Sequence, residues 1–332
     1  MMKKGKCILL YSGGLDSLIA GKILIDQGLE VIGLHCILPY FPPDMDPDQL
    51  KESVNAKQIG LNLVHYRCGE EYISMLKNPL HGYGKQINPC IDCKIFFINK
   101  AAEMMLETGA DFVATGEVVG QRPMSQHKNT LIHIENSTLK GRLLRPLSAK
   151  LLNPTIPEIE GIVDRENLYD ISGRGRTRQI ALAASLGIKD FSSPAGGCLF
   201  TDAFIAARIK DLMKYNPDFK QRDLYLLKTG RHFRINPDLK IIVTKNQNES
   251  LELDKYERDS DFFFRPGFSG PSVLVKGVLK EEDINLINSI MCRYGKPTSE
   301  ENNITIYKNN NIHRELKCIE PISDAELDKY RI

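Results

Sequence analysis

The sequence has no apolar run long enough to cross a membrane, and it has no repeats or low-complexity tracts. The apolar run behind the basic start at residues 1–6 ends at Tyr11, which makes it too short for a signal peptide. A net charge of +2 gives no general basic surface, so any RNA-binding surface must be local. We therefore expect a cytoplasmic protein without a membrane partner.

The composition is that of an ordinary globular protein. The chain has 332 residues, of which 42% are hydrophobic and 26% are charged, and this length suggests about two domains. It contains eight cysteines. In a cytoplasmic protein we expect them to be metal ligands, nucleophiles or buried apolar residues rather than disulfides.

The segment at residues 6–18 indicates an anion-binding site. Residues 7–11 are typical of a buried strand, and residues 18–25 have the apolar spacing of a helix. Glycines between them let the backbone approach a phosphate closely, and the free N–H groups that begin the helix point at it. The residues expected to bind a nucleotide here are Ser12, Gly13, Gly14, Asp16 and Ser17.

Asp16 is the carboxylate expected to hold Mg²⁺ against the phosphates. The turn contains no lysine, which excludes a P-loop of the Gly-Lys-Ser/Thr type. The alternative is an ordinary turn in which Asp16 caps the helix.

Strands and helices alternate over residues 6–147, which predicts an α/β domain with a doubly wound, largely parallel sheet. Ligands bind such sheets at the carboxyl ends of the strands. A second strand at residues 29–37 therefore makes Leu34 a candidate to line an adenine pocket, although core packing explains this leucine equally well.

The composition changes near residue 216, where short strands at 239–243 and 272–276 and a helix at 281–291 predict a second, smaller α+β domain. We expect three parts, which are a first domain at residues 1–203, a helical connector at 204–229 and a C-terminal domain at 230–332.

Cys90 and Cys93 form a CxxC pair just before a helix expected at residues 94–106, and Cys198 lies in a glycine-flanked loop far downstream. A CxxC pair can be half of a zinc site, a redox dithiol or part of an iron–sulfur site. No second pair is evident for a four-ligand zinc site, and the surroundings do not match a thioredoxin-like pair. Two ordinary buried thiols are a further alternative.

The turn Ser12-Gly-Gly-Leu-Asp-Ser17 resembles the pyrophosphate loop of the PP-loop ATP pyrophosphatases, which cleave ATP between the α- and β-phosphates and adenylate a substrate. Residues 88–93 (Asn-Pro-Cys-Ile-Asp-Cys) and 109–116 resemble the tRNA 2-thiouridylases of this class, and residues 193–198 resemble their second cysteine loop. Residues 145–147 (Arg-Pro-Leu) resemble a short motif of the 4-thiouridine synthases.

The chain departs from these families at two points. Glu117 stands where the 2-thiouridylases usually have histidine. We also expect the chain to lack the RNA-binding THUMP module that precedes the loop in many 4-thiouridine synthases, because the loop begins at residue 12.

The resemblance implies that Asp16, Cys90, Cys93 and Cys198 are catalytic and that Gly116 contacts the nucleotide. A CxxC pair plus one distant cysteine resembles the tRNA thiolases that bind a four-iron four-sulfur (4Fe-4S) cluster. Cys90, Cys93 and Cys198 would then be the metal ligands, with one iron open for sulfide. In the competing route Cys198 carries a persulfide, which Cys90 or Cys93 resolves through a disulfide. The extra CxxC cysteine favours the cluster.

Two segments suggest contacts with RNA. Arg174, Arg176 and Arg178 lie in a glycine-containing window without a carboxylate, which suits phosphate contacts, although a solvated loop explains it equally well. Residues 240–277 resemble the RNA-binding NFACT-R domain. Their aromatic and cationic side chains suit stacking on bases, and the run at residues 262–264 (Phe-Phe-Phe) cannot be entirely core in a strand, because alternate side chains face opposite ways.

Together these features predict an ATP-dependent tRNA uridine thiolase that makes 2-thio- or 4-thiouridine and releases AMP and pyrophosphate. Its cofactors would be ATP, Mg²⁺ and the cluster. Its partners would be tRNA and a sulfur donor, which is sulfide, a cysteine desulfurase or a carrier protein. The alternatives are a PP-loop ligase that forms an amide or nitrile on a small molecule, and a non-catalytic RNA-binding protein.

Overall fold

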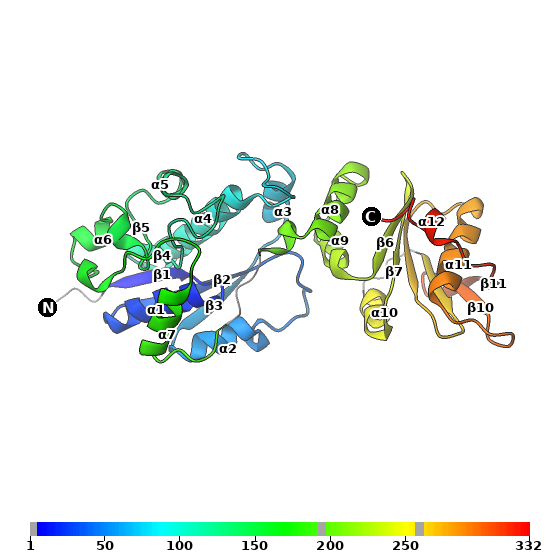
Figure 1. Cartoon of the computed structure of the whole chain (residues 1–332), viewed down its shortest axis with the longest axis horizontal. Helices are drawn as coiled ribbons and strands as arrows, with labels where there is room; N and C mark the ends of the chain where they lie inside the picture. Colours follow the sequence, from blue (N-terminus) through cyan, green and yellow to red (C-terminus); the bar gives the residue numbers. More distant parts are fainter. Residues whose placement is uncertain (1–4, 192–196, 256–261) are drawn as a thin grey trace. The chain divides into compact units, whose positions relative to one another are not determined.

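The computed structural model describes residues 5–191, 197–255 and 262–332, and the chain forms two compact units, residues 1–201 and 202–332 (Figure 1). Among the described residues, no helix has the length and apolar character needed to cross a membrane.

The first unit is built on a five-stranded sheet with the order β3-β2-β1-β4-β5, in which every pair of neighbours is parallel. Its strands are β1 (Lys6–Leu10), β2 (Glu30–Ile37), β3 (Asn62–Arg67), β4 (Phe112–Thr115) and β5 (Leu143–Leu144). Strand β1 lies at the centre because its three buried residues, Cys7, Ile8 and Leu9, are apolar on both faces. The parallel sheet predicted from the sequence is confirmed.

Helices cover both faces of this sheet (Figure 1). One face carries α1 (Leu15–Asp26), α2 (Lys51–Lys57) and α7 (Thr177–Ser185), and the other carries α4 (Cys90–Thr108) and α5 (Lys128–Asn136). Further helices are α3 (Glu70–Lys77) and the short α6 (Ile156–Ile159). Successive residues of β1 enter different clusters, because side chains alternate along a strand. Leu9 packs with α1, whereas Ile8 packs with α4. The sheet is therefore doubly wound, as predicted.

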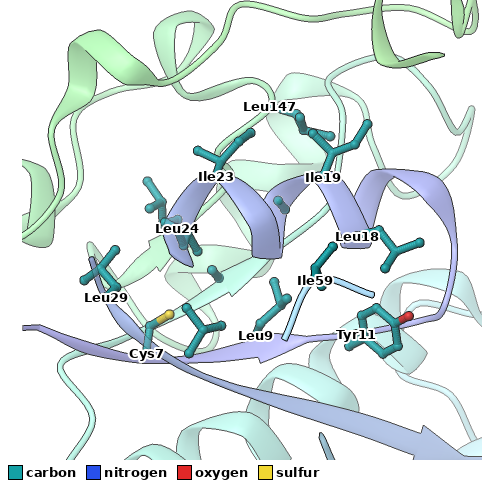
Figure 2. Packing of buried hydrophobic residues seen from close by; sticks show 14 of the residues in the cluster. Cys7, Leu9, Tyr11, Leu18, Ile19, Ile23, Leu24, Leu29, Ile59 and Leu147 are labelled. Atoms are coloured by element: carbon teal, nitrogen blue, oxygen red, sulfur yellow. The ribbon is translucent and has the colours of Figure 1, made fainter. Parts of the chain in front are cut away.

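The central helix α1 is buried on most of its surface. Figure 2 shows Leu18, Ile19, Ile23 and Leu24 in the cluster between β1 and α1, with Leu147 beside Ile19. Such a helix cannot tilt or slide without opening cavities in the core. The turn that leads into it is therefore held rigidly at the carboxyl end of β1.

The second unit has a six-stranded antiparallel sheet with the order β11-β10-β8-β9-β7-β6. The strands are β6 (Arg231–Asn236), β7 (Leu239–Val243), β8 (Phe262–Pro266), β9 (Val273–Gly277), β10 (Asn303–Lys308) and β11 (Asn311–Lys317). Its helices are α8 (Ala203–Tyr215), α9 (Gln221–Tyr225), α10 (Gln247–Asp254), α11 (Glu281–Tyr294) and α12 (Asp324–Leu327). The predicted smaller α+β domain is thus confirmed as a fold. The segment expected to be a connector, residues 204–229, is grouped with this unit.

Both faces of the second sheet are covered. Phe264 and Phe263 are fully buried on opposite faces, in clusters formed with α11 and with Leu253 of α10. Phe262 is half-buried and packs beside the α11 cluster. The phenylalanine run therefore serves mainly as core, and two of its three rings are not available for stacking on bases.

Two cysteines of this unit correct the expectation that the chain has no disulfides. Cys292 of α11 and Cys318, which follows β11, are disulfide-bonded, with their Cα atoms 6.0 Å apart. That separation lies in the usual range for a disulfide. Strand β11 places the two residues together across a 26-residue separation, which no local pattern in the sequence reveals.

Candidate functional site

The turn between β1 and α1 is shaped as an anion cradle. Gly13 has a φ of +73°, and a Cβ at this position would collide with the side chain of Glu52, so glycine is required there. The Ser17 hydroxyl donates to the Gly14 carbonyl over 2.8 Å and accepts from the Ser12 N–H over 3.3 Å. The first N–H groups of α1 have no acceptor within the helix. The turn is therefore pre-formed to receive a phosphate.

Asp16 begins the first turn of α1, and its two carboxylate oxygens differ. Oδ2 accepts a hydrogen bond from Nε2 of Gln121 over 3.1 Å. Oδ1 is buried and has no hydrogen-bond partner among the described residues. An unpaired buried carboxylate oxygen is costly unless a cation or donor reaches it. This oxygen fits a Mg²⁺ ion held against a bound phosphate.

Gly116 lies directly after β4 and packs on the start of α1. A Cβ on Gly116 would come within 2.6 Å of the Asp16 carbonyl carbon and 2.5 Å of the Ser17 nitrogen. Only glycine permits this approach. Gly116 therefore positions the nucleotide turn through a backbone contact.

The residue after Gly116 connects this turn to the cysteine helix. Glu117 is 2% exposed, and its carboxylate contacts Nε of Arg145 over 3.1 Å and Nζ of Lys94 over 3.3 Å. Burial would raise the pKa of Glu117, but Lys94 and Arg145 outweigh it and hold this pKa below its usual value. Lys94 follows Cys93 in the first turn of α4. The ion pair thus joins the nucleotide side of the sheet edge to the CxxC pair.

The CxxC pair is held at the N-terminus of α4 by neighbouring polar side chains. The Tyr72 hydroxyl lies 3.2 Å from Sγ of Cys93, and the amide of Asn88 donates to Sγ of Cys90 over 3.1 Å. Burial raises the pKa of Cys93 to about 12, against the opposing effects of Tyr72 and Lys94. Cys93 is therefore a protonated thiol at neutral pH unless a partner removes its proton.

Cys198 interacts electrostatically with both cysteines of the CxxC pair. Its charge and that of Cys90 raise the pKa of Cys93, and Cys90 raises the pKa of Cys198 in turn. Although Cys198 is exposed as a residue, the partial burial of its sulfur raises its own pKa first of all. Residues 193–196 of the predicted second cysteine loop lie outside the described residues.

The three cysteines match an iron–sulfur cluster in donor chemistry but not in arrangement. Thiolates are the usual ligands of such clusters. In the described part of the chain, however, no three His, Cys, Asp or Glu side chains are grouped to hold a metal ion. Their use as cluster ligands stays a prediction.

The other predicted site residues occupy different surroundings. Leu34 is buried in the α4-side cluster, and its carbonyl accepts a hydrogen bond from the Tyr11 N–H over 3.0 Å. Arg174 is exposed, Arg178 pairs with Asp170 over 2.6 Å, and Arg176 is half-buried. Contacts of these residues with adenine or RNA stay predictions.

A comparison with protein families now identifies the first unit. Residues 2–172, just over half of the chain, match the family model described as Thiamine biosynthesis protein (ThiI). The chain belongs to the ThiI family. Residues 230–331 match the NFACT protein RNA binding domain, so both resemblances noted in the sequence are confirmed.

Curated relatives of this ThiI-family chain include tRNA-modifying enzymes. A probable tRNA sulfurtransferase of Thermococcus kodakarensis is 25% identical over 54% of the chain and 42% of its own length. One from Alkaliphilus metalliredigens is 29% identical over 44% of the chain and 36% of its own length. A tRNA-specific 2-thiouridylase MnmA of Leptospira interrogans is 30% identical, over 35% and 34%. The chain thus spans less than half the length of these relatives.

Among solved structures, a 4-thiouridine synthetase–RNA complex with bound ATP is 22% identical and covers 55% of this chain and 52% of its own. Its TM-score of 0.34 is too low to support an argument about this chain.

Sequence reasoning missed four side chains of the site, which are Glu52, Tyr72, Lys94 and Gln121. Lys94 directly follows a cysteine that was singled out, and Glu117 was noted only as a departure from a family. Glu52 and Gln121 come from the segments after β2 and β4, and only the folded chain places them against Gly13 and Asp16.

Proposed function

We propose that this protein thiolates a uridine of tRNA in an ATP-dependent reaction. The observation that carries the proposal is the link through Gly116, Glu117 and Lys94. It connects a pre-formed phosphate turn to a CxxC pair at the same edge of the sheet. An ATP-dependent adenylation followed by sulfur transfer needs the nucleotide site close to the sulfur carrier, because the sulfur must attack the activated carbon before water hydrolyses the adenylate.

The first step is adenylation of the base. The O2 or O4 oxygen of the uracil attacks the α-phosphate of ATP, a P–O bond forms, and the bond to pyrophosphate breaks. The N–H groups that begin α1 and the hydroxyls of Ser12 and Ser17 would stabilise the charge that develops on the leaving group. Asp16 would hold Mg²⁺, which neutralises the phosphates.

The second step replaces AMP with sulfur. In the route through this chain's own thiols, a persulfide on Cys198 attacks the activated carbon through its terminal sulfur, and AMP leaves with the C–O bond electrons. Cys90 or Cys93 then attacks Sγ of Cys198, which releases the thionucleoside and leaves a disulfide. A dithiol reductant must reset this disulfide. The outer sulfur of this persulfide would arrive as sulfane sulfur, transferred to the Cys198 thiolate from the persulfide of a cysteine desulfurase or a carrier protein, whose own thiolate is the leaving group. Sulfide, which is already fully reduced, would serve as the donor only in the cluster route.

The alternative sulfur carrier is the four-iron four-sulfur cluster, with Cys90, Cys93 and Cys198 as its ligands. It would present a sulfide at an open iron. Three thiolates have the right chemistry to bind such a cluster, whereas the three side chains are not grouped as metal ligands in the described part of the chain.

The RNA would be recruited by two parts of the chain. The curated relatives act on tRNA by name, and the second unit matches an RNA-binding domain, which supports tRNA as the substrate. The arginine segment at residues 174–178 adds guanidinium groups suited to phosphate contacts. A tRNA substrate is consistent with a reaction in the cytoplasm.

The test is product analysis. Purified protein, ATP, Mg²⁺, unmodified tRNA and a sulfur donor, either a persulfidated carrier protein or sulfide, should yield AMP, pyrophosphate and a thiolated nucleoside detectable by mass spectrometry. AMP formation that depends on a small acid, with no thionucleoside, would instead favour a PP-loop ligase. No AMP formation at all would favour a non-catalytic RNA-binding protein.

A further inference from the structure

Helix α7 begins with two polar side chains that have buried atoms. Gln179, its third residue, is 0% exposed, and neither Oε1 nor Nε2 has a hydrogen-bond partner among the residues that the structure describes. Nε of Arg176, the residue before the helix, is likewise buried and unpaired within these residues. Buried polar groups in native proteins have partners, so these atoms point to something that binds between them.

The backbone at this place is also open. Helix α7 has nine residues, Thr177–Ser185, and within the described part of the chain no side chain caps its first turn. The N–H groups of such a first turn have no acceptor within the helix, and the helix dipole adds positive potential there. An amide, a guanidinium and free N–H groups together form a site rich in donors, which suits an anion.

This start of α7 adjoins the loop that touches the nucleotide turn. Ser172 and Val119 form a parallel bridge, and the Gly173 N–H donates to the Val119 carbonyl over 2.8 Å. Two residues after Val119, Gln121 donates to Asp16. The anion-type site of α7 and the phosphate turn are therefore separated by one loop.

The packing of α7 points its unpaired glutamine the same way. Ala183, one turn after Gln179 and on the same face, lies in the cluster that contains Leu18 and Ile19 of α1, and the two helices are in contact. Long side chains on a helix lean toward its N-terminus. Gln179 therefore leans toward the start of α7, the end that follows the bridge between Ser172 and Val119.

We propose that Arg176, Gln179 and the N-terminus of α7 bind the β- and γ-phosphates of ATP, which leave together as pyrophosphate. This inference rests on the proposed function, because it adds a second anchor for the nucleotide bound at the Asp16 turn. Asp16 with its cation would neutralise one side of the polyphosphate, and the α7 site would hold the other. The inference also gives the two arginines different roles: Arg176 would bind phosphate, whereas Arg178 pairs with Asp170 and is exposed.

The experiment measures the affinities of the full-length protein for pyrophosphate and for AMP, each by calorimetry in Mg²⁺ buffer without RNA. Arg176→Gln and Gln179→Met should each weaken pyrophosphate binding by about tenfold or more, as expected for lost hydrogen bonds to a charged ligand. AMP affinity should be unchanged. Arg178→Gln is the matched control, since it removes a neighbouring guanidinium that has its own carboxylate, and it should change neither affinity.

Other results would overturn the inference. Unchanged pyrophosphate affinity together with a higher melting temperature of Gln179→Met would mean that the glutamine is an unsatisfied core residue. Equal weakening of AMP and pyrophosphate binding would mean general damage to the fold. Arg176→Lys, which keeps the positive charge, should bind pyrophosphate more tightly than Arg176→Gln, and equal affinities of these two variants would also contradict the inference. Unchanged pyrophosphate affinity in variants that bind tRNA more weakly, in a separate titration with tRNA, would assign the segment to RNA. Failure of the wild-type protein to bind either ligand would instead reject the proposed function.

Discussion

Among single residues, Asp16 gives the strongest indication of chemistry, because one of its carboxylate oxygens is unpaired among the described residues. Its Oδ1 is buried without a partner among the described residues, while Oδ2 is fixed by Gln121. A carboxylate held in this way has one oxygen committed to structure and one left for a cation. Substitutions here therefore test catalysis without removing a core contact.

Asp16→Asn should lower the rate of AMP formation by about a hundredfold or more, because the neutral amide no longer holds Mg²⁺ against the phosphates. The measurement is release of AMP from labelled ATP at saturating tRNA. Asp26→Asn, at the far end of α1 where Asp26 pairs with Lys22, is the control and should have wild-type activity. Wild-type turnover by Asp16→Asn would remove Asp16 from the mechanism.

The thiol of Cys198 should react unusually slowly at neutral pH. Only the thiolate reacts with iodoacetamide, and the raised pKa of Cys198 keeps the thiol protonated up to a higher pH than in a free cysteine, whose pKa is about 8.5. In metal-free protein, the alkylation rate at Cys198, followed by peptide mass spectrometry, should reach half its maximum above that pH. A midpoint below it would indicate an activated thiolate and would contradict the inferred surroundings.

At the scale of elements, the ion pairs of Glu117 connect α4 to the loop after β4. Arg145 is almost fully buried, and it also donates to Glu135 over 2.9 Å and to the Leu131 carbonyl of α5 over 3.1 Å. One guanidinium therefore holds three segments together. Removing it leaves the buried carboxylate of Glu117 with the ion pair to Lys94 and a hydrogen bond from the Thr115 hydroxyl.

Arg145→Met should lower the free energy of unfolding by about 3–5 kcal/mol at neutral pH, as expected when one partner of a buried pair is lost. The depressed pKa of Glu117 stabilises the fold above the carboxyl pKa of the unfolded chain, and this stabilisation is lost as the pH falls through the folded pKa. The difference between variant and wild type in urea unfolding should therefore shrink in acid. Arg178→Met removes an exposed pair and should cost less than about 1 kcal/mol.

The cluster hypothesis also belongs to this scale, because α4 and the segment at Cys198 must move together to form one metal site. Reconstituted without oxygen, the wild-type protein should bind about four irons per chain, the number of a cubane cluster. Single Cys→Ala changes at Cys90, Cys93 or Cys198 should each abolish the visible absorption, whereas Cys7→Ala, far from these loops in the α1 cluster, should retain it. An iron-free wild type that accumulates a persulfide on Cys198 and still thiolates tRNA would exclude the cluster.

Local patterns in the sequence predicted the helices and strands well, but they predicted poorly which distant residues pack against one another. The strand, glycine turn and helix around Asp16 follow from residues within one segment, and the structure has all three. Packing between distant segments decided the rest. The second face of the C-terminal sheet is covered by α10, so Phe263 and Phe264 are both core, and Cys292 meets Cys318 only through strand pairing. Gln179 looked like an ordinary helix residue until its burial was known.

At the scale of the whole molecule, each of the two units has hydrophobic clusters of its own. The clusters on both faces of the parallel sheet use residues up to Ile188, and those on both faces of the antiparallel sheet begin at Leu226. A chain with independent cores can be divided at its boundary, here between residues 201 and 202, with each part able to fold. The nucleotide turn, the three cysteines Cys90, Cys93 and Cys198, and the α7 site all lie on one side of this boundary.

A fragment of residues 1–201 should therefore bind ATP within about twofold of the full-length affinity, because the phosphate turn and its supporting core are complete within it. Its affinity for tRNA should fall by about tenfold or more, and the salt dependence of binding should flatten, because phosphate contacts of the second unit are lost. Both quantities are measured on the same preparations, with the fragment's melting transition as the control for folding. A folded fragment that binds tRNA as tightly as the whole chain would place the RNA surface in the first unit. The arginine segment at residues 174–178 would then be the next region to test.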